Sequence, residues 1–138
     1  MSLPTEKQEK MRGTLGGIPD PQERLMAATS WKTTLEPLRQ EDRTEGNLVR
    51  GCVSRVWLAA AMEQGRCRFR VDSDSPLVGG LARLLCGIYD GATPEEVLAE
   101  EPVAMEELGI LRNLSPTRQN GLAMMRRALV EFAAKAVR

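Results

Sequence analysis

The chain has 138 residues, 42% of them hydrophobic, and its 19 basic residues balance 19 acidic ones. This length fits one compact domain with a single core, and the absence of net charge argues against a nucleic-acid partner. No apolar run reaches the roughly eighteen residues of a membrane span, and the first residues lack the apolar middle of a secretory signal. We therefore expect a cytoplasmic protein, without a membrane partner, whose thiols stay reduced. Residues 1–138 should form a single domain, with 1–19 as an N-terminal extension that is partly helical or mobile.

Four dipeptides, each with a side-chain oxygen followed by proline, predict helix starts. They are Asp20-Pro21, Ser75-Pro76, Thr93-Pro94 and Ser115-Pro116. Glu23 and Glu96 stand where a capping box needs them. Apolar residues at three- and four-residue steps predict that the first of these helices is amphipathic and breaks near Pro37.

Two segments rich in strand formers follow a polar connection. Residues 53–62 precede the turn letters EQG, and residues 66–71 then alternate apolar side chains with three arginines. We interpret the arginines as the solvated face of a hairpin. A third short strand around residues 48–50 is expected. The fold class is therefore α+β, with a small antiparallel sheet of about three strands flanked by helices.

The second half of the chain is expected to be helical. A broad apolar stripe follows Pro76 and predicts a buried helix that ends near the letters DGATP. A short helix should run from Pro94 to about Glu100, and a brief helical turn should follow around residues 104–109. The last helix begins at Pro116 and turns one apolar face inward.

The three cysteines lie far apart, and the chain has no histidine. Zinc and a disulfide framework are therefore disfavoured. Cys67 and Cys86 have apolar surroundings typical of small buried side chains, whereas Cys52 lies between Gly51 and a strand, on a loop at the rim of the sheet. For Cys52, the residues alone leave a semi-buried structural thiol and a functional thiol equally open.

Acidic residues next to the third helix start could suggest a metal. Asp72 and Asp74 lie just before Pro76, where carboxylates more simply complement a helix N-terminus. Two carboxylates also fall short of the ligand number that hard cations require. We expect no metal and no cofactor.

A thiol reacts as its thiolate, which needs cationic or hydrogen-bonding surroundings. Around Cys52 these could come from Arg50, Arg55 or an arginine brought close by folding. The absence of histidine excludes a cysteine–histidine protease pair. Sulfur transfer, thiol exchange and redox sensing remain as chemistries for this residue.

Three separated segments together resemble one known family, the SufE-like sulfur acceptors that work with cysteine desulfurases. The first reproduces the spaced pattern R-x3-N-x-V-x-G-C-x-S-x-V-W over residues 43–57, and the others read DSDSPLVGGL (72–81) and LSPTRQNGLAMM (114–125). The likeness runs from about residue 20 to about residue 134. Thr117, Asn113, Val53 and Arg55 depart from the residues usual in the family. Arg55 and the letters MEELG resemble the CsdE branch, whereas TPEEVL and LSPTR resemble the SufE branch.

The resemblance implies a role for each matching residue. Cys52 would accept sulfane sulfur from a persulfide on a cysteine desulfurase of the SufS or CsdA type, stimulate that enzyme, and pass the sulfur to an iron-sulfur scaffold such as SufBCD. The chain would be an accessory protein and not an enzyme. Gly51, Arg118, Asp74 and Arg55 are the expected supporting or partner-binding residues. The family also implies a loop cysteine that retracts at rest and swings out when docked.

Other functions stay open at this stage. One is a CsdE-type partner that feeds another sulfur or tRNA-modification pathway. A second is a regulatory module that binds the desulfurase and carries no sulfur, and a third is a thiol redox sensor. A homodimer is also left open.

Overall fold

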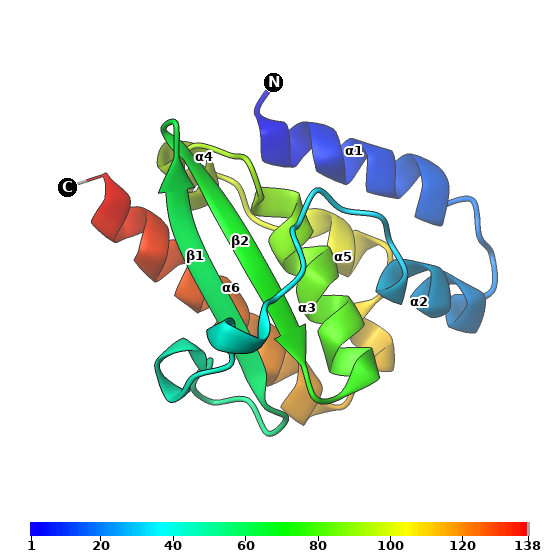
Figure 1. Cartoon of the computed structure of the whole chain (residues 1–138). Coiled ribbons are helices and arrows are strands. Elements are labelled where there is room, and N and C mark those ends of the chain that lie inside the picture. Colours follow the sequence, from blue (N-terminus) through cyan, green and yellow to red (C-terminus); the bar gives the residue numbers. More distant parts are fainter. Residues whose placement is uncertain (138) are drawn as a thin grey trace.

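The computed structural model describes residues 1–137, and its class is α+β, as predicted (Figure 1). The α-helices of the described residues are α1 (Leu3–Leu15), α2 (Pro21–Thr29), α3 (Pro76–Tyr89), α4 (Pro94–Ala99), α5 (Val103–Glu107) and α6 (Pro116–Ala136). The strands are β1 (Val56–Glu63) and β2 (Arg66–Ser73). Short 3-10 turns occupy Gln40–Asp42, Glu45–Asn47 and Leu111–Asn113. None of the helices within residues 1–137 has the length and apolar character needed to span a membrane.

The four predicted helix starts are confirmed. Asp20, Ser75, Thr93 and Ser115 each accept a hydrogen bond from the amide three residues later. Glu96 closes the capping box of α4 by accepting from the Thr93 amide at 3.0 Å. Ser2 caps α1 in the same way. Met11 and Leu15 of α1 belong to the hydrophobic core, so this helix packs on the rest of the molecule.

Helix α2 is shorter than the apolar spacing suggested. The hydroxyls of Thr29 and Ser30 both donate to the carbonyl of Met26, at 2.8 and 3.0 Å, where the helix ends. Thr34 then donates to the buried carboxylate of Asp90 at 2.7 Å, which is a contact to a distant part of the chain. Residues 30–49 consequently leave the helix and pass in front of the two strands (Figure 1).

The sheet has two strands in place of the three expected. They pair from Val56 opposite Ser73 to Glu63 opposite Arg66, and the turn places Gln64 and Gly65 at positive φ, as a tight hairpin requires. The expected third strand is reduced to one bridge, between Leu48 and Trp57. Directly after it, Gly51 adopts a φ of 88° and turns the chain away from the ladder.

Helices α3 and α6 complete the core with the hairpin. The side chains of Cys67, Phe69 and Val71 are at most 3% exposed. Phe69 meets Phe132 of α6 edge to face, with ring centroids 5.8 Å apart. Since α3 and α6 both begin near the start of β1, their first turns lie beside the loop that precedes it (Figure 1).

The other face of the hairpin is partly covered, which corrects the interpretation for two of its three arginines, whereas Arg66 is exposed as expected. Arg68 pairs with Asp90 at 3.2 Å, and Arg70 pairs with Asp42 at 2.9 Å. Both carboxylates are buried. The hydrogen bond from Arg70 holds the pKa of Asp42 below its usual range. The Arg70–Asp42 pair, together with the hydrogen bond from Thr34 to Asp90, holds residues 30–49 on the sheet and so holds the chain that leads into residue 50.

Candidate functional site

Cys52 lies on a short loop, residues 50–55, whose two ends are held by hydrogen bonds; we call it the thiol loop. Just before it, the Val49 amide donates to the Val56 carbonyl at 2.9 Å. At its other end, the Arg55 amide donates to the Asp74 carboxylate at 3.2 Å, and the Asp74 amide donates back to the Arg55 carbonyl at 3.2 Å. The loop is therefore fastened at both ends, with Cys52 between them.

Gly51 sets the direction of the thiol loop. Its φ of 88° lies in the left-handed region, and a Cβ at this position would stand 2.8 Å from the Cγ of Met124 on α6. Any larger residue would be strained and would push Met124 aside. The glycine lets the loop approach α6 closely and turns Cys52 back toward that helix.

The Cys52 side chain faces inward although its loop is exposed. Its Sγ lies 3.5 Å from the Gly121 carbonyl oxygen, to which the thiol donates. Val53, the next residue, is 84% exposed, whereas Cys52 is half-buried. Burial raises the pKa of the Cys52 thiol above its ordinary value. The inward position therefore favours the thiol over the thiolate.

A cavity of about 400 Å³ opens beside Cys52. Its walls come from the thiol loop, the first half of α3 and the first half of α6. The lining residues are Cys52, Val53, Ser54, Val78, Leu81, Ser115, Thr117, Arg118, Gly121, Leu122 and Met125. The floor is mostly apolar and Arg118 supplies the cationic group. The space accommodates a second sulfur atom bonded to Sγ.

The other residues singled out in the sequence fall into two groups. Arg118 lines the cavity, while Arg55 and Asp74 are not among the described residues that do so. Asp74 instead holds the Arg55 amide, and Ser75, not an aspartate, caps α3. Asp72 pairs with Arg83 at 2.6 Å. The two carboxylates therefore hold the surrounding structure in place, Asp72 through α3 and Asp74 through the thiol loop.

Sequence reasoning missed the two α6 residues that receive the thiol loop. Gly121 accepts the Cys52 hydrogen bond, and Met124 packs over Gly51. Both occur in the third motif, LSPTRQNGLAMM, so the signal was present in the sequence. Their contact with residues about seventy positions away became visible only in the fold.

The other two cysteines are fully buried, as predicted. Cys67 and Cys86 are both 0% exposed. Burial, followed by the charges of Glu95 and Asp90, raises the pKa of Cys67 to about 11, and burial raises the pKa of Cys86 as well. Of the three thiols, Cys52 alone is partly exposed.

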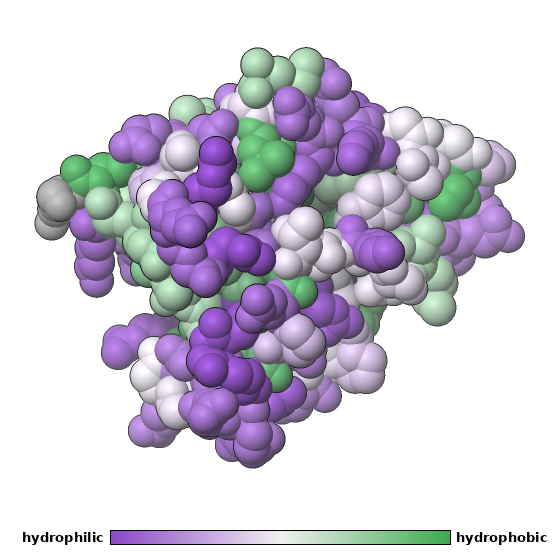
Figure 2. All heavy atoms as spheres, turned by 45° about the horizontal axis from the view of Figure 1, so that its top comes forward, coloured by the Kyte–Doolittle hydropathy of each residue, from purple (hydrophilic) through white to green (hydrophobic). Residues whose placement is uncertain are grey.

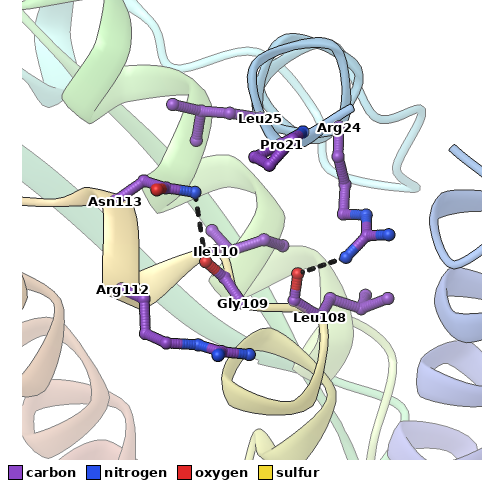
Figure 3. A pocket seen from close by; sticks show the side chains of 8 residues that line it. All are labelled: Pro21, Arg24, Leu25, Leu108, Gly109, Ile110, Arg112 and Asn113. Carbon is purple, nitrogen blue, oxygen red and sulfur yellow. Dashed lines mark hydrogen bonds between the residues drawn. The ribbon is translucent and has the colours of Figure 1, made fainter. Parts of the chain in front are cut away.

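A second cavity, of about 210 Å³, lies where α2 begins and α5 ends (Figure 3). Arg24 donates to the Leu108 carbonyl at 2.9 Å and also to the Ile18 carbonyl, and Asn113 donates to the Gly109 carbonyl at 3.4 Å. The Arg24 guanidinium is thus engaged by backbone oxygens. This cavity joins structural elements and contains no thiol, so we do not include it in the candidate site.

The buried position of Cys52 predicts a shifted pH profile for its alkylation. Because burial raises the thiol pKa, the folded state favours the protonated form, and the thiolate fraction rises only at higher pH than in the unfolded chain. The rate of reaction with iodoacetamide should therefore have its midpoint at higher pH in the native protein than in the urea-unfolded protein. Peptide mapping would assign the label to Cys52. Coincident midpoints would show that the inward position is not the populated one.

The comparisons with known proteins agree on one family. Residues 9–133 match the family described as SufE: Fe-S metabolism associated domain. An uncharacterized SufE-like protein of Synechocystis sp. is 37% identical over 102 residues, which cover 74% of this chain and 64% of that protein. SufE-like protein 1 of Arabidopsis thaliana, chloroplastic/mitochondrial, is 35% identical over 124 residues, covering 89% of this chain and 33% of that protein.

Two further matches bear on the fold and on the length of the relatives. The solution structure of a hypothetical protein from Thermus thermophilus has a TM-score of 0.77 at 23% identity and covers 99% of this chain and 98% of its own, which shows a shared fold. A chloroplastic quinolinate synthase of Oryza sativa subsp. japonica is 40% identical over 92 residues, which cover 66% of this chain and 13% of that enzyme. The chain spans less than two thirds of the length of the curated relatives it matches. With the family match extending over nearly all of its residues, the chain belongs to the SufE family.

Proposed function

We propose that this protein accepts sulfur on Cys52 from the persulfide of a cysteine desulfurase and passes it on for iron-sulfur cluster assembly. The observation that carries the proposal is the position of Cys52: it is the partly exposed thiol, it lies on a loop fastened at both ends, and it borders a cavity of about 400 Å³. Membership of a family associated with Fe-S metabolism supports the same role.

The transfer needs no oxidant, reductant or histidine from this chain. The Cys52 thiolate attacks the outer sulfur of the donor persulfide, a new S–S bond forms, and the donor's own S–S bond breaks. The bonding electron pair leaves with the inner sulfur, which becomes a thiolate on the donor. The proton of the donor persulfide stays with the transferred sulfur. Cys52 ends as a persulfide and the donor cysteine is regenerated.

The proposed cycle uses two positions of the thiol, the inward one that the structure shows and an outward one in the docked state. In the inward position Cys52 is a protonated thiol beside the Gly121 carbonyl, which is a poor environment for a thiolate. Attack therefore requires the thiol loop to turn Cys52 outward, toward the donor. Returning inward, the persulfide would enter the cavity between α3 and α6, away from solvent oxidants, with Arg118 at its wall.

The partners and place of action are part of the same proposal. The donor is a cysteine desulfurase of the SufS or CsdA type, whose activity this protein stimulates, and the recipient is an iron-sulfur scaffold such as SufBCD. The protein works in the cytoplasm as an accessory factor without turnover of its own. Gly51 directs the thiol loop, Asp74 fastens it through Arg55, and Arg118 steadies the anionic sulfur.

The proposal predicts a defined mass change. After incubation with cysteine and a cysteine desulfurase, the protein should gain the mass of one sulfur atom, and a reductant should remove it. Digestion under non-reducing conditions should locate the gain in the peptide that contains Cys52. A control without desulfurase should show no gain. If the sulfur is absent, or is found on Cys67 or Cys86, Cys52 is not the acceptor.

A further inference from the structure

The charges of this chain are balanced overall but segregated along the sequence. From residue 46 to residue 62 the charged residues are Arg50 and Arg55, and from 108 to 130 they are four arginines with no acidic residue. The first of these segments holds the thiol loop and the second holds the start of α6, and the two meet at Cys52. These two segments are therefore basic although the protein is neutral, while the carboxylate of Asp74 holds one end of the thiol loop.

Three of these arginines lie around Cys52; we call Arg50, Arg55 and Arg118 the arginine rim. All three are exposed. None of them takes part in an ion pair with another side chain of residues 1–137. Asp74 holds the backbone amide of Arg55 and not its guanidinium. Arginines elsewhere, such as Arg68 and Arg70, are paired with buried aspartates, so the rim differs from them.

Acidic residues predominate in another segment of the sequence. Residues 84–111 carry seven acidic residues and no basic one. They include the exposed Glu95 of α4, which lies at the end of the hairpin far from the start of β1 (Figure 1). Figure 2 shows the face at this end as mainly hydrophilic, with hydrophobic side chains only in small separate groups. The exposed Glu95 thus lies away from the thiol loop, although basic residues such as Arg66 and Arg126 contact this segment.

The arginine rim does not serve to activate the thiol in its inward position. The pKa of Cys52 is raised, and burial is the cause. Arg50, Arg55 and Arg118 are all exposed, and so is the apolar residue Val53 next to Cys52. Exposed cations near an apolar residue are suited to a partner surface with the opposite charge, because such complementarity guides docking and fixes its orientation.

We propose that the arginine rim is the docking surface for an acidic face of the sulfur donor, whose carboxylates surround its persulfide. This inference rests on the proposed function and adds the chemistry of the partner. Carboxylates of the donor pair with Arg50, Arg55 and Arg118, and this pairing orients Cys52 toward the donor.

The electrostatic potential at Cys52 can be measured on this protein alone, from the rates at which two disulfide probes react with the thiol. Dithiobis(nitrobenzoate) carries two negative charges, and dithiodipyridine carries none. The anionic probe should react with Cys52 faster at low salt than at high salt, while the uncharged probe should be insensitive to salt. In the variant Arg50→Glu/Arg55→Glu the anionic probe should slow by about tenfold at low salt, and the uncharged probe should keep its rate.

Matched variants separate charge from structure. Arg50→Gln/Arg55→Gln should give an intermediate rate with the anionic probe. Lys10→Glu/Lys32→Glu changes the net charge by the same amount at a different cavity and should leave both probes unaffected. Equal slowing of both probes by Arg50→Glu/Arg55→Glu would point to a damaged thiol loop and overturn the inference, as would an unchanged rate with the anionic probe.

The second arm uses a cysteine desulfurase that loads the wild-type protein. Loading of Arg50→Glu/Arg55→Glu should be about tenfold slower at low salt and less affected at high salt. If Arg50→Glu/Arg55→Glu is loaded as fast as the wild type, the inference is overturned and the proposed function still stands. Absence of loading in the wild type would overturn the proposed function itself. If charge reversal abolished saturable RNA binding but not loading, the rim would be a nucleic-acid surface and the inference would be wrong.

Discussion

Replacing Cys52 with serine is expected to abolish sulfur loading while the protein keeps its fold. Serine is close in size, and its hydroxyl can donate to the Gly121 carbonyl as the thiol does. The hydroxyl oxygen cannot take a sulfane sulfur by thiol–persulfide exchange, because the exchange proceeds through a thiolate. With radiolabelled cysteine and a desulfurase, the wild type should carry label and Cys52→Ser should carry none. Circular dichroism and thermal unfolding of the two proteins should coincide closely.

The control variant is Cys86→Ala. Cys86 is 0% exposed and lies inside α3, so its removal costs some stability but should leave the loading of Cys52 intact. Label that persists on Cys52→Ser would contradict the carrier role. Desulfurase stimulation that survives in full in the unlabelled Cys52→Ser protein would favour the regulatory module. A redox sensor that uses an internal disulfide needs a second reachable thiol, and both remaining cysteines are buried.

The parts of the fold that the sequence predicted are local ones. A serine, threonine or aspartate before proline begins a helix because its own side chain satisfies an amide three residues away, so Ser75 and Ser115 can be recognised without the rest of the chain. The hairpin could also be predicted locally, because its turn residues, Gln64 and Gly65, lie directly between the two strands that pair. Alternation in residues 66–71 identified which face is buried.

What could not be predicted depends on partners far along the chain. The apolar spacing after Pro21 looked helical, but Thr34 finds Asp90 fifty-six residues later, and the segment leaves the helix to reach it. Arg68 and Arg70 of β2 looked solvated, but both pair with buried aspartates from distant parts of the chain. In the site, Gly51 and Cys52 were recognisable as a motif, whereas the inward turn of the thiol depends on Gly121. Periodicity carries no information about such distant contacts.

Replacing Asp90 with alanine is expected to cause the largest loss of stability of the changes considered. Asp90 is 1% exposed, and its carboxylate accepts three hydrogen bonds: from the Phe69 amide at 2.9 Å, from Arg68 at 3.2 Å and from Thr34 at 2.7 Å. It thus joins β2, α3 and residues 30–49. Alanine would leave a buried amide and a partly buried cation without their acceptor, which costs about 3 kcal/mol in the free energy of unfolding.

Urea and thermal unfolding would measure this loss, with a fall in melting temperature of roughly 10 °C. Asp90→Asn keeps one acceptor oxygen for the Phe69 amide but loses the charge opposite Arg68, so its loss should be intermediate. Glu131→Ala removes a surface pair with Arg127 and should change stability by less than about 0.5 kcal/mol. A loss below about 1 kcal/mol for Asp90→Ala would show that residues 30–49 are held by other contacts. Below its melting temperature, Asp90→Ala should still load sulfur, because Val78 and Leu81, which line the cavity at Cys52, lie at the opposite end of α3.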